Sequence, residues 1–121
     1  MYFLTAKGGF SAAHWIREYP GKCSHIHGHN WRVQLTVRVD ELNSLGMGID
    51  FYELKSVLKK ITDSLDHTCL NELPFFSEAN PTAENIARFI FDEAKKRLPR
   101  DVKPYELRLC ETDNNCVTYR E

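Results

Sequence analysis

The sequence has almost no net charge and no long hydrophobic run, and each absence excludes a class of partner. There are 16 Lys and Arg residues against 17 Asp and Glu residues, a formal net charge of −1, so no overall positive field attracts nucleic acid. No apolar stretch approaches the roughly 20 residues that cross a bilayer, and the first residues lack the charged-then-apolar pattern of a secretory signal. We therefore expect a cytoplasmic protein without a nucleic acid or membrane partner.

Cysteine is also scarce. The four cysteines, Cys23, Cys69, Cys110 and Cys116, could pair as two disulfides, but their spacing is irregular and a reducing cytoplasm favours free thiols. Internal repeats and low-complexity segments are absent as well. With 121 residues, 42% of them hydrophobic and 27% charged, the chain has the composition of an ordinary globular protein. We therefore expect a single domain over residues 1–121.

Hydrophobic periodicity predicts four strands. Residues 2–15 are rich in apolar and aromatic side chains and predict a strand, with a bulge favoured over residues 7–9, where two glycines follow a lysine. Residues 31–40 alternate apolar with polar side chains, which is the clearest strand signal in the chain. Residues 105–110 alternate in the same way, and residues 116–120 can pair back on them as a short hairpin partner.

The middle of the chain predicts two amphipathic helices. One begins after Asp50 and repeats apolar residues three and four apart from Leu54 to Leu65, and the other begins after the capping residue Thr82 and ends before Pro99. The order strand, strand, helix, helix, strand, strand predicts an α+β fold, with an antiparallel four-stranded sheet and both helices on one face. The other sheet face would be exposed, and oligomerisation is the natural way to cover it.

Histidines are concentrated in one short segment, because three of the five lie between positions 25 and 29. On an extended segment His27 and His29 point to the same side, and Gly28 between them lets the backbone bend. His14, at the end of the preceding strand, can supply a third nitrogen. Three neutral imidazoles that leave a fourth position open are typical of catalytic zinc. We therefore expect these three histidines to hold a catalytic Zn2+ ion.

Two other interpretations of the histidines stay open. Isolated histidines in loops and cores are usually satisfied by hydrogen bonds, without a metal. Alternatively, Cys23 or His25 closes the tetrahedron as a fourth ligand, which would make the zinc structural and the chain a noncatalytic zinc-stabilised binding module.

Two carboxylates favour chemistry over a closed metal site. Asp66 precedes His67 just after the first helix, where it could orient an imidazole for proton transfer, although a favourable interaction of His67 with the helix dipole is the simpler interpretation. Glu111 follows a strand with an apolar face, and if it points inward it can accept two parallel N–H groups from a guanidine-like heterocycle. If it points outward, Glu111 is a solvent-exposed carboxylate.

These residues fall in six ordered motifs, with which the chain resembles the superfamily of 6-pyruvoyl-tetrahydropterin synthases and 6-carboxytetrahydropterin synthases over nearly its full length. The motifs are Phe10-Ser11-Ala12-Ala13-His14, Cys23 with His27-Gly28-His29, Ile49-Asp50-Phe51, Leu65-Asp66-His67, Asn80-Pro81-Thr82-Ala83-Glu84, and Glu111-Thr112.

The resemblance implies a role for each site residue. It implies zinc at His14, His27 and His29, Cys23 as catalytic base with Asp66 and His67 as its partners across a subunit interface, Glu111 as the anchor of the pterin ring, and Thr82 in the pterin pocket. It also implies a tunnelling (T-fold) domain that assembles through its sheets into a barrel of stacked trimers, a homohexamer.

The resemblance further implies a reaction on a pterin triphosphate. Three residues separate Cys23 from His27, which resembles the bacterial queuosine-pathway enzymes, whereas the biopterin enzymes usually place five residues there. The implied reaction converts 7,8-dihydroneopterin triphosphate into 6-carboxy-5,6,7,8-tetrahydropterin, acetaldehyde and triphosphate. The alternative is a 6-pyruvoyl synthase, which releases triphosphate alone. Lys7, Arg17 and Lys22 are candidates for binding the triphosphate.

Overall fold

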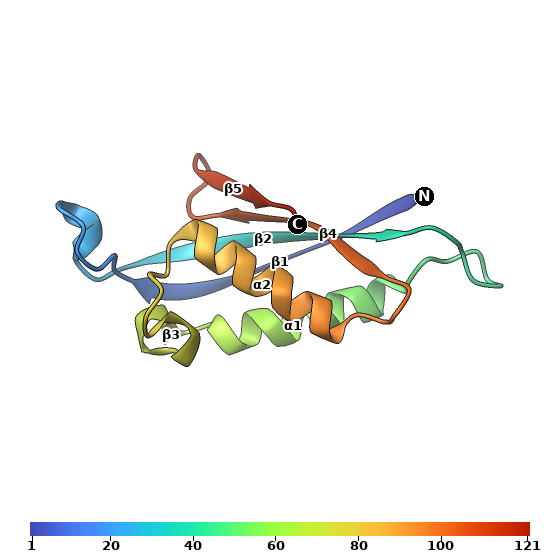
Figure 1. Ribbon diagram of the computed structural model, residues 1–121, viewed down its shortest axis with the longest axis horizontal. Helices are drawn as coiled ribbons and strands as arrows, with labels where there is room; N and C mark the ends of the chain where they lie inside the picture. The colour runs from blue at the N-terminus through green and yellow to red at the C-terminus, as the bar shows by residue number, and fades with distance from the viewer.

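A computed structural model describes all 121 residues, which form one sheet with two helices packed on it (Figure 1). The sheet has the strand order β3-β1-β2-β4-β5. All neighbours are antiparallel except β3, which runs parallel to β1. The strands are β1 (Tyr2–His14), β2 (His27–Val39), β3 (Thr68–Cys69), β4 (Lys103–Cys110) and β5 (Cys116–Tyr119). The α+β class is confirmed, but the sheet has five strands and not four, because two residues after the first helix pair with the end of β1.

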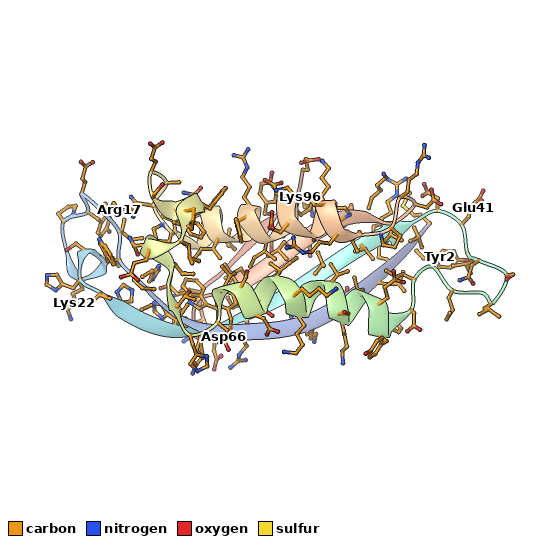
Figure 2. The ribbon with its side chains drawn as sticks, turned by 90° about the horizontal axis from the view of Figure 1, so that it is seen from below. Tyr2, Arg17, Lys22, Glu41, Asp66 and Lys96 are labelled. Atoms are coloured by element: carbon orange, nitrogen blue, oxygen red, sulfur yellow. A yellow bond between two sulfur atoms is a disulfide. The ribbon has the colours of Figure 1, made fainter.

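The two helices are α1 (Phe51–Leu65) and α2 (Ala83–Arg97), and they lie side by side along one face of the sheet (Figure 2). The Asp50 side chain accepts a hydrogen bond from Tyr52 N and so caps α1, and Thr82 accepts one from Asn85 N, as its predicted role as a cap requires. Three short 3-10 turns complete the fold: η1 (Lys22–Ser24), η2 (Leu70–Glu72) and η3 (Pro74–Phe76). Neither helix has the length and apolar character needed to cross a bilayer.

The core lies between the helices and the sheet and contains 24 buried apolar residues. Alternate residues of β2, from Trp31 to Val39, point into it, and α1 contributes the stripe from Leu54 to Leu65. Burial of one such side chain stabilises the fold by about 1.5–3 kcal/mol. The core therefore fixes the register of the long β1–β2 pair, because a shift by one residue would turn the apolar side chains to solvent.

The bulge expected over residues 7–9 is absent, because β1 and β2 pair without a shift from Tyr2 opposite Val39 to His14 opposite His27. Position 9 requires glycine because the neighbouring backbone is too close for a larger residue. A Cβ there would lie 2.8 Å from the backbone oxygen of Trp31. The irregularity of the sheet lies instead between β2 and β4, at the step between Thr36 and Val37 of β2.

The face of the sheet that the helices leave uncovered carries mainly polar side chains. Thr5 and Thr36 share a hydrogen bond of 2.8 Å, and Arg120 forms an ion pair with Glu106 at 2.8 Å. The exceptions are aromatic residues at the end of the sheet remote from His14, such as the exposed Phe3. Hydrophobic burial alone therefore does not force this face to be covered.

Candidate functional site

Three histidines converge where β1 ends and β2 begins. His14 and His27 lie directly opposite each other in the β1–β2 register, and His29 is two residues further along β2, on the same face. The ring centroids are 4.6 Å apart for His14 and His27, 5.2 Å for His14 and His29, and 4.8 Å for His27 and His29. The structure thus brings together the three imidazoles that the sequence analysis grouped.

Hydrogen bonds orient two of these rings. Nδ1 of His14 lies 2.7 Å from the backbone oxygen of Pro81, and Nδ1 of His27 lies 2.7 Å from the backbone oxygen of His25. A carbonyl oxygen only accepts, so each Nδ1 carries the proton and each Nε2 keeps a free lone pair. Metal-binding histidines commonly use this arrangement to fix their tautomer and ring orientation.

Burial leaves two nitrogen atoms of the cluster without partners. His14 is only 2% exposed, and Nε2 of His14 and of His29 are buried without a hydrogen bond. Burial lowers the pKa of both histidines below the usual 6.5, because the charged form would lose its hydration. The rings are therefore neutral at neutral pH, as metal ligands must be. A metal ion would satisfy both buried nitrogens, so the donor set fits one.

Glu111 joins the histidines as a fourth group with a possible ligand atom. The ligand atoms of His14, His27, His29 and Glu111 all lie within 4.8 Å of one another. Glu111 directly follows β4, and its Oε1 lies 3.3 Å from Nε2 of His29, close to that nitrogen but without the geometry of a hydrogen bond. The sequence pattern suggested Glu111 as a ligand for a heterocycle, and its closeness to the imidazoles is a finding of the structure. Either role requires the inward orientation that the structure shows.

A pocket of about 270 Å3 adjoins the histidines. It brings Cys23 and Thr82 together with His14 and His27, although Cys23 belongs to η1 and Thr82 lies at the start of α2. Cys23 is a free, exposed thiol, whereas the Thr82 hydroxyl already accepts the capping hydrogen bond from Asn85 N. The polar and ionisable side chains that line it are those of His14, Tyr19, Cys23, His27, Thr82, Glu84 and Glu111.

Glu84 is the carboxylate of this pocket that sequence reasoning missed. It is the acidic residue in the first turn of α2, just after the Thr82 cap. Acidic residues are common there because they interact well with the helix dipole, so the pattern had an ordinary structural explanation. The sequence signal that could have identified Glu84 was its position at the end of the motif Asn80-Pro81-Thr82-Ala83-Glu84.

Asp66 and His67 do not line this pocket. His67 flanks a separate hollow of about 330 Å3 on the other side of His29, and its side chain is 85% exposed. Ser11 N donates to Oδ1 of Asp66 at 2.8 Å, and Nδ1 of His67 lies 2.8 Å from Oδ2 of the same carboxylate. These contacts, with Ser11 first, hold the pKa of Asp66 below its usual value. The two side chains are thus linked to each other, but they are not part of this pocket within the same chain.

The candidate triphosphate ligands differ in their surroundings. The Arg17 guanidinium donates to the backbone oxygens of Ala79 and Asn71, at 3.4 and 3.2 Å, so it ties two loops together. Lys7 lines a hollow against α1, away from the histidines. Lys22 belongs to η1 and precedes Cys23, and Arg17 follows Ile16, so each of these two candidates adjoins a residue that lines the pocket.

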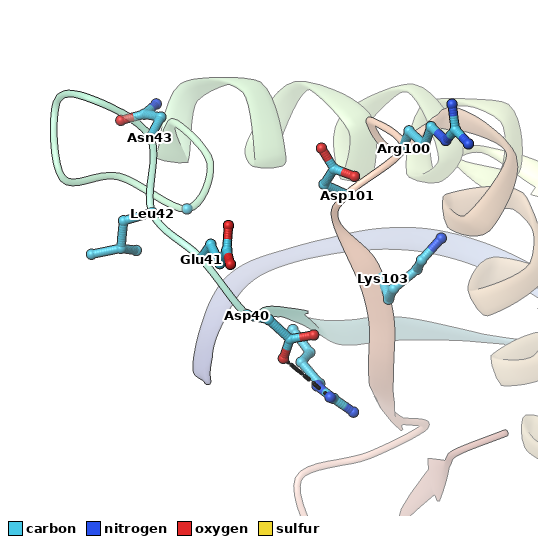
Figure 3. Close-up of a pocket in the computed structure, with 9 residues that line it drawn as sticks. Asp40, Glu41, Leu42, Asn43, Arg100, Asp101 and Lys103 are labelled. Carbon is cyan, nitrogen blue, oxygen red and sulfur yellow. Dashed lines mark hydrogen bonds and ion pairs between the residues drawn. The ribbon is translucent and has the colours of Figure 1, made fainter.

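The largest hollow, about 770 Å3, is at the opposite end of β2 from His27 (Figure 3). It contains no histidine or cysteine, and its walls carry charges of both signs. Among them, Arg38 and Asp40 already neutralise each other across 3.1 Å. Size alone therefore does not identify the site, and the smaller pocket beside the histidines holds the reactive groups.

The expectation of four free thiols is wrong, because Cys110 and Cys116 form a disulfide. The two residues are cross-strand partners in the β4–β5 hairpin, with Cα atoms 4.0 Å apart. Only the strand register brings them together, so spacing along the chain did not reveal the pair. Cys23 and Cys69 are free.

The fold and this cluster define an α+β protein with a candidate metal centre beside a thiol, and comparison with known proteins gives the family. Residues 3–121 match the family model described as 6-pyruvoyl tetrahydropterin synthase. The chain therefore belongs to the 6-pyruvoyl tetrahydropterin synthase family, whose members act as lyase-type enzymes in pterin biosynthesis.

Relatives with two different printed activities match the chain. The 6-pyruvoyl tetrahydrobiopterin synthase of Poecilia reticulata is 36% identical over 132 residues, covering 98% of this chain and 89% of the relative. The 6-carboxy-5,6,7,8-tetrahydropterin synthase of Bacillus subtilis is 43% identical over 94 residues, covering 73% of this chain and 62% of the relative. The solved 6-pyruvoyl tetrahydropterin synthase of Caenorhabditis elegans superposes with a TM-score of 0.90 at 27% identity, covering 99% of this chain and 95% of that one.

Proposed function

We propose that this chain is a zinc-dependent 6-carboxy-5,6,7,8-tetrahydropterin synthase of queuosine (7-deazapurine) biosynthesis. It converts 7,8-dihydroneopterin triphosphate into 6-carboxy-5,6,7,8-tetrahydropterin and releases acetaldehyde and triphosphate. The observation that carries the proposal is a pocket lined by the free thiol of Cys23, by two carboxylates and by two imidazoles of the three-histidine cluster. The short spacing from Cys23 to His27 and the Bacillus subtilis relative favour the carboxy-type product.

The metal in this proposal is Zn2+, held by His14, His27 and His29. Three imidazole nitrogens with a further position open suit catalytic zinc. When bound, the ion would supply Lewis-acid polarisation of hydroxyl oxygens on the substrate side chain.

The residues around the cluster divide the remaining work. Glu111 accepts N–H groups from the edge of the pterin ring, and Thr82 lines the ring's pocket. Together, the contacts of Glu111 and Thr82 with the pterin ring fix which carbon of the substrate lies near Cys23. The Cys23 thiolate then takes a proton from that carbon. The support is that all three residues line one pocket, although they come from separate segments of the chain.

We further propose that Asp66 and His67 complete the pocket of a neighbouring subunit in a homohexamer, a dimer of trimers. The exposed His67 and the separate hollow beside it support this arrangement, because the pair has no reacting group to act on within its own chain. Asp66 holds the imidazole in place, and His67 exchanges protons with the neighbouring thiol or substrate.

Product analysis tests the reaction. Purified zinc-loaded protein is incubated with 7,8-dihydroneopterin triphosphate, and every product is identified by mass. We expect 6-carboxy-5,6,7,8-tetrahydropterin and acetaldehyde from the wild type and none from Cys23→Ala. Cys69→Ala is the matched control, because Cys69 is the other free thiol and lies outside the pocket. A wild-type protein that leaves the substrate unchanged would refute the proposal.

A second candidate is a 6-pyruvoyl synthase, which the Poecilia reticulata and Caenorhabditis elegans relatives favour. It would release triphosphate from the same substrate without acetaldehyde, so the same assay separates the two. If the chain were instead a noncatalytic zinc-stabilised module, chelation would unfold it. A chelated protein that keeps its fold and loses its activity rules out that third candidate.

A further inference from the structure

The disulfide between Cys110 and Cys116 lies on the outer side of the site. Cys110 is the last residue of β4, Cys116 is the first residue of β5, and Arg32 of β2 is the other neighbour of Cys110 in the sheet. Because Leu109 is buried and side chains alternate along a strand, Cys110 points to the face that the helices leave uncovered. Cys116 is exposed. A small thiol in solution therefore has access to the disulfide.

The same alternation turns the next residue, Glu111, to the inner face and toward His29. Beyond the disulfide and the β4–β5 pairing, three contacts hold the turn of residues 111–115, and one of them is a hydrogen bond of 3.3 Å from Asn114 N to the Thr112 hydroxyl. Glu111 N donates to the backbone oxygen of Asn115 at 3.0 Å, and Asp113 forms an ion pair with Arg32. Both members of that ion pair are about two-thirds exposed or more, and such pairs contribute little. The covalent link is thus the strongest single contact across the base of this turn, where it adds to the β4–β5 strand pairing.

We propose that Cys110 and Cys116 form a site of reversible thiol–disulfide exchange that sets the position of Glu111 in the pocket. The oxidised form holds the carboxylate beside His29. The reduced form releases the turn, and the carboxylate loses its fixed direction. The effect on pterin affinity rests on the proposed function, whereas the effect on the backbone of Glu111 does not.

The exchange needs a dithiol as its partner. One thiolate of the dithiol attacks the exposed sulfur of Cys116, the disulfide breaks, and Cys110 leaves as a thiolate that takes up a proton. The second thiol of the reductant loses its proton and attacks its own sulfur in the mixed disulfide, which releases Cys116 to take up a proton. Two electrons have passed to the protein, and the reductant has become a cyclic disulfide.

Glu111 is sensitive to such a change because of its chemistry. A carboxylate that accepts two parallel N–H groups must keep its plane aligned with the donors. Groups in a binding site lose most of their effect when their supporting contacts let them move by about 1 Å. Reduction should therefore weaken pterin binding more than it slows the proton transfer at Cys23, which belongs to a different segment.

The first experiment measures the thiol state and the hydrogen exchange of the protein without a ligand. Air-oxidised protein is alkylated under denaturing conditions and weighed, and we expect two modified cysteines before dithiothreitol and four afterwards. Hydrogen exchange should show that protection of the Glu111 amide falls at least about tenfold on reduction. Cys69→Ser is the control, and it should lose one alkylation without changing the exchange. Four reactive cysteines in oxidised protein, or equal protection in both states, would overturn the proposal.

The second experiment measures pterin binding in the pocket, by fluorescence titration with 7,8-dihydroneopterin. We expect the oxidised wild type to bind at least about 5-fold more tightly than desalted, reduced wild type and than the Cys110→Ser/Cys116→Ser variant. Equal pterin affinity of the oxidised and reduced proteins would contradict the proposal that the disulfide sets the position of Glu111. If no form binds the pterin, the proposed function fails, and the exchange measurement still decides whether the disulfide holds the turn.

Discussion

His14 contributes to the site through both of its ring nitrogens. Nδ1 is engaged by the backbone oxygen of Pro81, and Nε2 is buried without a partner beside the other two rings. A buried, unpaired nitrogen is costly unless something binds it. The position of this single residue therefore connects the end of β1, the loop before α2 and the histidine cluster.

Replacement of His14 tests the metal site directly. We expect His14→Ala to weaken Zn2+ binding by more than about 100-fold, because even the loss of an outer partner of a metal-binding histidine costs 10–100-fold. Competition with a chromogenic chelator measures the affinity. His25→Ala is the control, since only the backbone oxygen of His25 contacts the cluster. Equal zinc affinity in wild type and His14→Ala would show that His14 is no ligand.

Asp66 gives the protein a specific response to acid. Its folded pKa lies below 3.8, mainly because Ser11 N–H and then His67 stabilise the carboxylate. The ionised form thus stabilises the fold above pH 3.8, and this contribution is lost as pH falls through the lower folded pKa.

The matching variant is Asp66→Asn, which keeps an acceptor for Ser11 but has no charge. Its urea midpoint should fall less than that of the wild type between about pH 5 and pH 3. Asp63→Asn, which replaces a carboxylate that pairs with Lys59 on the surface of α1, serves as the control. Parallel pH profiles for wild type and Asp66→Asn would contradict the expectation.

At the scale of elements, the start of α2 has two tasks. Thr82 caps the helix by accepting a hydrogen bond from Asn85 N at 3.1 Å, and it also lines the pocket. Thr82→Ala should lower the free energy of unfolding by about 1 kcal/mol, measured by urea titration. Thr82→Ser keeps the hydroxyl and should restore most of this loss. If the two variants are equally unstable, the methyl group and not the cap is responsible.

The β1–β2 pair depends on the small size of Gly9. An added Cβ would lie 2.8 Å from the backbone oxygen of Trp31, and backbone cannot move without shifting the strands that carry the histidines. Gly9→Ala should destabilise the protein by roughly 1–3 kcal/mol in thermal unfolding. Gly8→Ala is the comparison, because its Cβ meets only the flexible Leu58 side chain, at 3.2 Å. A smaller loss for Gly9→Ala than for Gly8→Ala would contradict this explanation.

At the scale of the whole molecule, the proposed site draws on two chains. Cys23 lines the pocket beside the histidines, whereas Asp66 and His67 lie at another hollow. A monomer would keep these groups apart. Assembly is therefore a requirement of the proposed chemistry, even though the uncovered sheet face is mainly polar.

Mixing two inactive variants tests shared sites. Cys23→Ala and His67→Ala are each expected to lack activity alone. After the two are unfolded together and refolded, mixed oligomers contain some sites with an intact Cys23 from one subunit and an intact His67 from another. We expect part of the wild-type turnover to return. If the mixture stays inactive although mixed oligomers are present by native mass spectrometry, the two residues do not act across an interface.

Much of the fold followed from local patterns. The apolar stripes predicted α1 and α2, and alternation predicted β2 from Trp31 onward and the strand that precedes Glu111, whereas β2 in the structure already begins at His27. The two-residue strand β3 was missed, because a pair of residues has no measurable periodicity. The bulge was misplaced, because a glycine that allows close backbone approach looks the same in sequence as one that allows a bulge.

The sequence by itself determined which side chains share a face, since His27 and His29 must point the same way on any extended segment. Only the tertiary structure decided that His14 faces them, that Glu111 closes the group, that Cys110 pairs with Cys116, and that Asp66 and His67 lie elsewhere. The physical reason for this difference is the distance along the chain over which each effect acts. Periodicity acts between near neighbours in the chain, whereas strand register and the packing of the core bring distant segments together.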